Sequence, residues 1–383
     1  MVTVSGDWLT RPSTQAVCRM LEAAGYQALL VGGCVRNALL DAPVSDIDIS
    51  TDARPDQVIK LAKASGLKAI PTGIDHGTIT VVADGIAHEI TTFRKDVETD
   101  GRRAVVAFSE HLEDDAHRRD FTMNALYAHA DGRVIDPLGG LADLQQRRFR
   151  FIDDAEQRIR EDYLRILRYF RFHAWYGDAS AGMDPDALAA IAAHSGGLDS
   201  LSKERIGVEM LKLLGAPDPS PVIATMRQCG VLGHILEGAD DRGLAPLVHL
   251  ENTLEVSADP LRRLAVLGGQ NVSVSLRLSN KYTQRLREMR DAASGVMGAA
   301  ELGYRHDADL AVCALLLRSA WLEMPLPKSV MSEAKRGDQA EFPVRAADLI
   351  ARFQGAALGA ELRRIESRWI ASDFQLSRDQ LLS

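Results

Sequence analysis

The stretch LLVGGCVRNALLDAPVSDIDIST, residues 29–51, decides how the first part of this chain folds. An apolar run ends at Gly32 and Gly33, and a short helical pattern follows from Val35. Glycine lets a backbone approach a phosphate closely, and the free N–H groups at a helix start bind anions. The alternative is a simple tight turn. Strand, glycine pair and helix together predict a mixed α/β unit with a candidate phosphate site.

Two aspartates follow in the segment SDIDIS. The alternation of side chains along a strand predicts Asp46 and Asp48 on one face, with Ile47 and Ile49 on the other. Neighbouring carboxylates repel each other unless a cation lies between them, and Mg²⁺ prefers carboxylate oxygen. The pair therefore predicts a metal site, and a solvated strand face is the alternative.

The combination of these features is more specific than either part. Arg36 can add a charge-assisted contact to a phosphate at the glycine pair. A phosphate site followed by two carboxylates predicts nucleotidyl transfer with two Mg²⁺ ions, which activate a hydroxyl and stabilise the departing pyrophosphate. Glu89, in the expected strand AHEITTF, is the candidate third carboxylate; a surface glutamate is the equally weighted alternative.

The chain changes character along its length. Its 383 residues are enough for two or more packed units. Residues 1–95 alternate between helical and strand patterns, whereas the pattern is helical almost throughout from about residue 141. Residues 99–117 between them are polar and predict a long irregular segment. No apolar run reaches the ~20 residues that span a membrane. Four scattered cysteines without a CxxC pair predict reduced thiols and a cytoplasmic protein.

The charge distribution bears on nucleic-acid binding. The net charge of −8 counts against such a partner, but binding depends on a local patch and not on the total. Residues 145–172 hold eight arginines against five acidic residues. The acidity is therefore unevenly spread, and a basic region remains available.

Seven motifs in order now carry a family resemblance: GGCVRN, SDIDIS, GIDHGTITV, RRDFTMNALY, DPLGGLADLQQRRFRFI, EDYLRILRYFRF and LSKERIGVEMLKLL. Together they resemble the bacterial-type CCA-adding tRNA nucleotidyltransferase and poly(A) polymerase family of the DNA polymerase β superfamily. The resemblance implies an α+β fold, with a small mixed α/β head over residues 1–140 and an all-helical remainder. Residues 141–215 would form a nucleotide-selecting neck, and residues 216–383 a tRNA-binding body and tail.

The resemblance also implies roles for individual residues. Residues of the glycine turn and of the RRD segment, which is residues 118–120, would bind nucleotide together with a nearby asparagine. They are Gly32, Gly33, Arg36, Arg118 or Arg119, Asp120 and Asn124. Asp46 and Asp48 would hold Mg²⁺. Four residues match the nucleotide-selecting helix: Asp162, Arg165, Arg168 and Arg171. One position departs from the pattern, because Asn37 stands where most relatives have Asp; a hydrogen-bonding role survives there, but not a charged one.

The segment EDYLRILRYFRF supports base selection on chemical grounds. A helix through it would align Glu161, Arg165, Arg168 and Phe172 along one stripe, with Asp162 beside it. Cytosine and adenine each present an amino donor beside a ring-nitrogen acceptor, which a carboxylate and an arginine can pair. Uracil and guanine present the opposite pattern and would leave both protein groups unpaired. The alternative is a helix held by salt bridges.

These observations predict a cytoplasmic enzyme that adds CMP and AMP, from CTP and ATP, to the 3′ end of tRNA at its acceptor arm without a template. Poly(A) polymerase, or an enzyme adding only CC or only A, stays open. Two other classes are a catalytically silent RNA-binding protein and an antibiotic-type small-molecule nucleotidyltransferase. The intact Asp46, Asp48 and Arg36 argue against the first, and the long helical tail against the second. The oligomeric state is left open.

Overall fold

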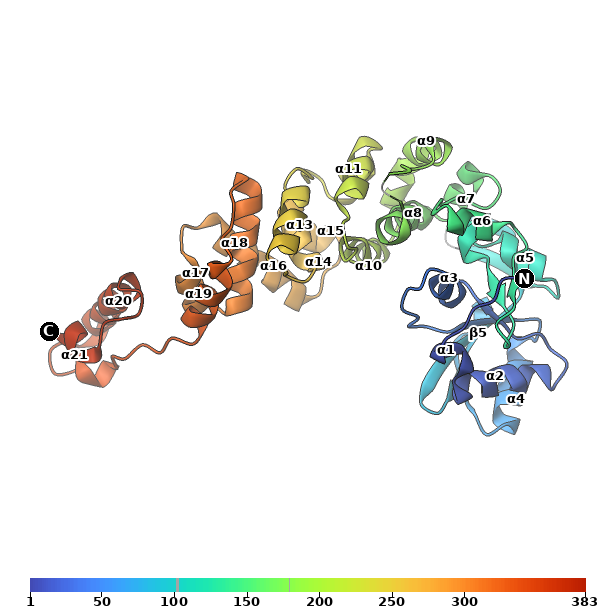
Figure 1. The fold of residues 1–383 in the computed structure, drawn as a ribbon, viewed down its shortest axis with the longest axis horizontal. Helices are drawn as coiled ribbons and strands as arrows, with labels where there is room; N and C mark the ends of the chain where they lie inside the picture. Colours follow the sequence, from blue (N-terminus) through green and yellow to red (C-terminus); the bar gives the residue numbers. More distant parts are fainter. Residues whose placement is uncertain (101–102, 179) are drawn as a thin grey trace. The chain divides into compact units, whose positions relative to one another are not determined.

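The computed structural model describes residues 1–100, 103–178 and 180–383 (Figure 1). The chain divides into two compact units. The first contains residues Met1–Glu209 and Thr225–Ile235, and the second contains Met210–Ala224 and Leu236–Ser383. The head and the greater part of the expected neck thus share the first unit. The division at residues 140 and 215 stays a prediction.

Within the described residues, seven strands form the main sheet of the first unit, in the order β3-β4-β5-β2-β1-β8-β9. β2 and β5 run parallel, and the other neighbours in this sheet run antiparallel. The strands are β1 (Leu29–Val31), β2 (Asp48–Thr51), β3 (Lys68–Gly73), β4 (Thr78–Ala83), β5 (Ile86–Thr92), β8 (Tyr127–Ala128) and β9 (Val134–Ile135). The parallel pair places β2, with its aspartate, beside the strand of Glu89.

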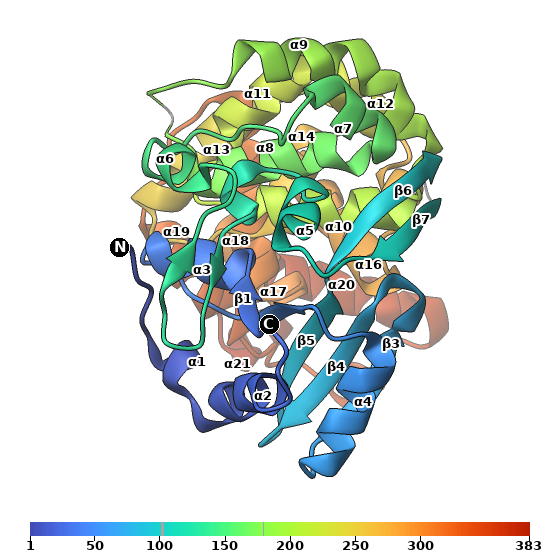
Figure 2. The ribbon, with the colours of Figure 1, turned by 90° about the vertical axis from the view of Figure 1, so that its right-hand side faces the viewer.

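Helices α2 (Pro12–Glu22) and α4 (Pro55–Ala64) pack against strands β4 and β5, as Figure 2 shows. Both helices begin with proline, whose fixed φ suits the first helical position and whose missing N–H has no partner to lose there. The buried side chains Val17, Leu21 and Val58 supply their apolar faces. Two further helices belong to the head, α1 (Asp7–Thr10) and α3 (Gly33–Leu39).

The expectation of a long irregular segment at residues 99–117 is wrong for the residues described there. Strands β6 (Arg94–Asp100) and β7 (Arg103–Phe108) pair as an antiparallel hairpin, and helix α5 (Leu112–His117) follows. Three acidic residues in the first turn of α5, Glu113, Asp114 and Asp115, stabilise its start through the helix dipole. The polar composition of this segment therefore did not exclude regular structure. Residues 101 and 102 lie outside the described residues.

The described residues after Ile135, where the last strand ends, form helices and connecting segments, as predicted. The first unit continues with α6 (Gly140–Gln145), α7 (Ala155–Glu161), α8 (Leu164–Tyr176), α9 (Pro185–His194) and α12 (Val231–Ile235). Two helices span the division between the units, α10 (Lys203–Leu214) and α11 (Ser220–Gln228). The α+β fold is confirmed.

The second unit is helical, and several of its helices pack against the apolar α18 (Ala308–Leu322). The others are α13 (Leu244–Thr253), α14 (Pro260–Leu267), α15 (Val272–Ser275), α16 (Asn280–Ser294), α17 (Ala299–Arg305), α19 (Ser329–Asp338), α20 (Gly355–Ala371) and α21 (Arg378–Leu382). The buried Glu251 pairs with Arg262 at 2.7 Å and with Arg263 at 2.8 Å. α17 and α19 approach so closely that a Cβ at Gly303 or Gly337 would strike the backbone of the facing helix. No helix in the described ranges is both long and apolar enough to cross a membrane.

Candidate active site

The glycine turn between β1 and α3 adopts a conformation that depends on glycine. Gly32 has φ 70° and ψ −118°, a conformation that residues with a Cβ rarely adopt, and its N–H donates to the carbonyl of Leu126 at 3.0 Å. The nearest atom that a Cβ on Gly33 would meet is Arg36 Nη2, at 4.0 Å. Space therefore remains against the backbone of this turn.

Arg36 faces protein partners in this structure. It is buried, and its Nη1 donates to Asn124 Oδ1 at 2.6 Å. Nε and Nη2 donate to Asn37 Oδ1 at 3.1 and 2.8 Å, and Nη2 also donates to the Tyr176 hydroxyl at 3.2 Å. The guanidinium lies 4.9 and 4.6 Å from the ring centres of Phe172 and Tyr176. Arg36 therefore contacts α8, which the position of Arg36 in the sequence did not indicate.

Asn37 extends this contact toward the aspartates. Its Nδ2 donates to the carbonyl of Pro43 at 2.8 Å, in the loop that leads to Asp46. An aspartate at this position has no N–H and cannot make that bond. Asn37 thus joins Arg36 to the loop that carries a predicted metal ligand.

The three candidate carboxylates do not share one strand. β2 begins at Asp48, so Asp46 lies in the preceding loop, where it is exposed and accepts a hydrogen bond from Ser45 Oγ at 3.0 Å. The expectation that both aspartates occupy one strand face is therefore wrong. Asp48 pairs in register with Glu89 of β5. Burial above all, together with repulsion from Glu89 and Asp46, raises the pKa of Asp48 to about 6.

Carboxylates that face one another on neighbouring strands, with one pKa raised, suit a cation. Nevertheless, in the part of the chain that the structure describes, no three Asp, Glu, His or Cys side chains converge as a ready metal site. Mg²⁺ is commonly held by one or two carboxylates, with water and substrate phosphates completing its coordination. The donor set of Asp48, Asp46 and Glu89 fits that incomplete kind of site.

Arg118 and Arg119 are both bound by Asp115, which the sequence analysis did not single out. Oδ1 of Asp115 accepts from Arg118 Nη2 at 2.5 Å, and Oδ2 accepts from Arg119 Nη2 at 3.0 Å. The signal was available, since Asp115 stands three and four residues before the two arginines in an acidic helix start.

A buried hydrogen-bonded chain connects the glycine turn to α8. Arg36 donates to Asn124, Asn124 Nδ2 donates to Asp120 Oδ1 at 3.0 Å, and Arg168 Nε donates to Asp120 Oδ2 at 2.7 Å. Burial opposes the charge of Asp120, but Arg168 and Asn124 hold its pKa at about 2. The structure therefore brings together four predicted site residues from three segments of the sequence.

The proposed base-reading pair is arranged differently from the expected continuous helix. α7 ends at Glu161 and α8 begins at Leu164, while Asp162 between them is extended, with φ −153° and ψ 103°. Asp162 Oδ1 accepts from the Leu164 N–H at 3.1 Å, and Oδ2 accepts from Arg205 Nη2 at 2.6 Å. The single stripe predicted through this segment is wrong, because the Asp162 side chain satisfies the start of a new helix.

Arg165 is held by a different set of partners. Its Nη1 donates to Glu161 Oε2 at 2.6 Å and to the carbonyl of Arg158 at 2.8 Å, and Nη2 donates to the carbonyl of Arg118 at 3.2 Å. Asp162 and Arg165 thus do not bond each other in this structure. Arg165 instead ties the neck to the RRD segment.

Three arginines lie close to the ring of Phe172. The guanidinium carbons of Arg36, Arg168 and Arg171 lie 4.9, 5.4 and 4.2 Å from its centre. Arg171 Nε also donates to Glu209 Oε2 at 2.6 Å. Tyr176, Arg205 and Glu209 were not among the expected site residues, because their contacts with the site cross long distances in sequence.

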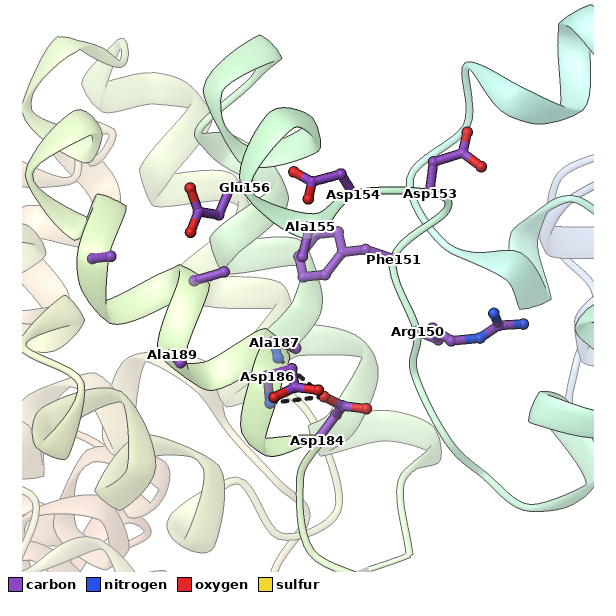
Figure 3. Close-up of a pocket in the computed structure, with 12 residues that line it drawn as sticks. Arg150, Phe151, Asp153, Asp154, Ala155, Glu156, Asp184, Asp186, Ala187 and Ala189 are labelled. Atoms are coloured by element: carbon purple, nitrogen blue, oxygen red, sulfur yellow. Dashed lines mark hydrogen bonds between the residues drawn. The ribbon is translucent and has the colours of Figure 1, made fainter.

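Figure 3 shows a separate cavity of about 660 Å³ beside α7 and α9. The expected nucleotide-binding residues do not line it. Its lining carries one arginine, Arg150, and five carboxylates: Asp153, Asp154, Glu156, Asp184 and Asp186. Like charges repel, so this cavity disfavours a triphosphate.

Comparisons with known proteins agree with these features. Residues 28–150 match the family described as "Poly A polymerase head domain", and residues 182–242 match "Probable RNA and SrmB-binding site of polymerase A". CCA tRNA nucleotidyltransferase 1, mitochondrial, of Mus musculus is 31% identical over 96% of this chain and 88% of its own length. A CCA-adding enzyme of Streptococcus pyogenes is 43% identical over 55% of this chain and 51% of its own length.

Solved structures extend the likeness to the fold. The Bacillus stearothermophilus CCA-adding enzyme in complex with CTP has a TM-score of 0.78 and 27% identity, covering 94% of this chain and 93% of its own. The Thermotoga maritima CCA-adding enzyme complexed with tRNA has a TM-score of 0.71 at 19% identity, covering 100% of this chain and 98% of its own. The chain therefore belongs to the CCA tRNA nucleotidyltransferase and poly(A) polymerase family, as its seven motifs predicted.

Proposed function

We propose that this protein adds CMP and AMP, from CTP and ATP, to the 3′ end of tRNA and so completes or repairs a CCA end. The observation that carries the proposal is the placement of Asp48 beside Glu89, in a head whose glycine turn leaves room for phosphate. The whole-chain likeness to proteins named CCA tRNA nucleotidyltransferase supports tRNA as the substrate.

Magnesium is the proposed cofactor. Asp46 and Asp48 would hold it, with Glu89 beside them. When bound, Mg²⁺ lowers the pKa of an attacking hydroxyl and neutralises charge on departing pyrophosphate. The chain's own part is to hold the substrate groups in place: the glycine turn would bind phosphate through its backbone, and β2, which carries Asp48, is the neighbour of β1, the strand that leads into this turn.

Of the two arginines in the RRD segment, Arg119 is the better phosphate ligand. A Cβ built on Gly32 would lie 3.5 Å from Arg119 Nη1, so this nitrogen faces the glycine turn. Arg36 has a different proposed role from the expected one: it positions the turn against Asn124 and α8.

Base selection is proposed for Asp162 and Arg165. The Asp162 side chain is 30% exposed, so its carboxylate can exchange the bond with Arg205 for the amino group of cytosine or adenine. Arg165 donates to the ring nitrogen beside that group. UTP and GTP are rejected because their carbonyl groups face the Asp162 carboxylate. Arg168 and Arg171, held by Asp120 and Glu209, support α8, which carries Arg165 and begins two residues after Asp162.

The proposed location is the cytoplasm. Within the described residues all four cysteines are free, and Cys18, Cys34 and Cys313 are buried, as expected of a protein that does not rely on disulfides. The second unit is the proposed tRNA-binding part.

The test uses tRNA that ends at the discriminator base, incubated with each nucleoside triphosphate separately. The proposal expects one or two additions with CTP alone and none with UTP or GTP. Poly(A) polymerase remains the second candidate, because the head matches the family of that description. Long A tails on unrelated RNA with ATP alone would favour it and contradict CCA addition.

A further inference from the structure

The carboxylate of Asp115 lies fully buried behind the glycine turn. It extends from α5 and reaches β2 and β8, where Ser50 Oγ donates to Oδ2 at 3.2 Å and the Tyr127 hydroxyl donates to the same oxygen at 2.8 Å. A buried carboxylate is tolerated only where charges and hydrogen bonds compensate it. The compensating charges here are two arginines of the RRD segment.

Both arginines bind this one carboxylate. Arg118 donates from Nε at 2.8 Å and from Nη2 at 2.5 Å to Oδ1. Arg119 donates from Nε at 3.3 Å and from Nη2 at 3.0 Å to Oδ2. Ser50 and Tyr127 complete the enclosure, since Arg119 also donates to their hydroxyl oxygens at 3.1 and 3.0 Å.

This enclosure fixes the direction of Arg119. Nε and Nη2 are both occupied by Asp115 and its two hydroxyl neighbours, and the guanidinium carbon lies 5.3 Å from the Tyr127 ring centre. Within the described residues Nη1 makes no hydrogen bond, and it is the atom that a Cβ on Gly32 would approach at 3.5 Å. A planar guanidinium held on one edge presents its other nitrogen in a set direction.

We propose that Asp115 is a positioning residue for phosphate recognition, which holds Arg119 so that Nη1 faces a triphosphate lying on the glycine turn. The inference rests on the proposed nucleotidyl-transfer function and deepens it, because it explains how an arginine can be held rigid with a donor left over. Burial alone would raise the pKa of Asp115, but Arg119 and Arg118 hold it at about 2. The carboxylate therefore stays charged across the neutral range.

The test compares Asp115→Asn with a matched control in the full-length protein. Asp143 is also buried, at 1% exposure, and is bound by Arg148 at 2.6 Å and Arg150 at 3.0 Å. Asp143→Asn therefore disturbs a similar two-arginine carboxylate outside the glycine turn. The measurement is the inhibition constant of inorganic tripolyphosphate, together with KM and kcat for CTP and ATP. Thermal unfolding establishes that each variant is folded.

Asp115→Asn is expected to weaken tripolyphosphate binding by about ten- to a hundred-fold, the range for a lost charged hydrogen bond. KM for CTP and ATP should rise by the same factor for both. Asp143→Asn should leave the inhibition constant within about three-fold. If Asp115→Asn fails to fold, Tyr127→Phe removes one donor to the carboxylate and should give a smaller loss in the same direction.

A double variant makes the claim specific to Arg119. If Asp115 acts through Arg119, adding Asp115→Asn to Arg119→Gln should weaken tripolyphosphate binding no further. A folded Asp115→Asn protein that binds tripolyphosphate as tightly as wild type would overturn the inference, as would additive losses. Failure of the proposed function shows separately, in the nucleotides that the wild-type protein adds to tRNA.

Discussion

The guanidinium of Arg36 lies 4.6 Å from the centre of the Tyr176 ring and donates to the hydroxyl of the same residue at 3.2 Å. One arginine beside the glycine turn is thereby fastened to the last turn of α8. A second partner, Asn124, continues the contact to Asp120 and Arg168. The segment proposed to bind phosphate and the helix proposed to select the base are thus parts of one buried network.

This network predicts that Arg36→Ala lowers stability as well as nucleotide affinity. The change leaves Asn124 Oδ1 and Asn37 Oδ1 without their donors and removes a cation that lies against two rings, so a loss of about 2–4 kcal/mol in unfolding free energy is expected. Urea denaturation followed by tryptophan fluorescence measures it. Tyr176→Phe keeps the ring and loses only the hydroxyl, so it should lose about 1 kcal/mol or less. Equal losses in both variants would contradict the network.

The carboxylates give a prediction about turnover. Asp48→Asn should lower nucleotide addition by at least about a hundred-fold, because it removes a proposed metal ligand. Asp46→Asn should act similarly, while tRNA affinity stays near wild type and neither variant loses thermal stability. Nucleotide incorporation at saturating Mg²⁺ measures the effect. Substantial residual activity in Asp48→Asn would refute its assignment as a metal ligand.

Base selection is tested at Asp162. Asp162→Ala should lower kcat/KM for CTP and ATP by about ten- to a hundred-fold, the range for one charged hydrogen bond, and should let UTP compete. Single-nucleotide incorporation with each of the four triphosphates gives the ratios. Arg205→Ala is the control, because it removes the present partner of Asp162 but no base contact. A uniform loss that leaves the preference for C over U unchanged would reduce Asp162 to a structural role.

The buried His173 predicts a pH dependence of stability. Burial lowers its pKa to about 4, and its Nε2 is buried without a hydrogen-bond partner in the described residues. Between pH 6.5 and 4 the unfolded chain binds a proton at this residue that the folded chain does not, so stability falls as the pH falls through this window. The loss is about 3 kcal/mol by pH 4.

The variant that checks this is His173→Leu, which cannot titrate. Urea denaturation at pH 7, 5.5 and 4.5 should show wild type losing stability relative to the variant as the pH drops. The two proteins should differ by a constant amount above pH 7. Parallel stability profiles across the whole range would show that His173 is not the group responsible.

Several strands and helices of the first unit could be predicted from the sequence because local patterns govern them. β4 coincides with the β-branched run TITVVA, residues Thr78–Ala83. The glycine pair starts α3, and β2 begins at the second aspartate of DIDIS and ends one residue after it, at Thr51. These elements follow from alternation, β-branched residues and glycine, all of which act over a few neighbouring positions.

The site was less predictable, since its contacts join distant segments. Nothing local indicates that Arg36 meets Tyr176, which lies 140 residues further along the chain. The helix break at Asp162 was not predicted for a different reason. The side-chain pattern of this segment fits one continuous helix, but the Asp162 carboxylate accepts a hydrogen bond from the Leu164 N–H and so favours the start of a new helix. Asp115 was within reach of local reasoning, through its spacing from Arg118 and Arg119.

The most direct measurement sequences the 3′ ends of a tRNA that stops at its discriminator base, after incubation with the wild-type protein, Mg²⁺ and all four nucleoside triphosphates. The proposed function predicts that extended molecules end in C, CC and CCA in that order of appearance, that growth stops after the A, and that Asp48→Asn yields none of them. Ends with runs of A, ends containing U or G, or no extension by the folded wild-type protein would contradict it.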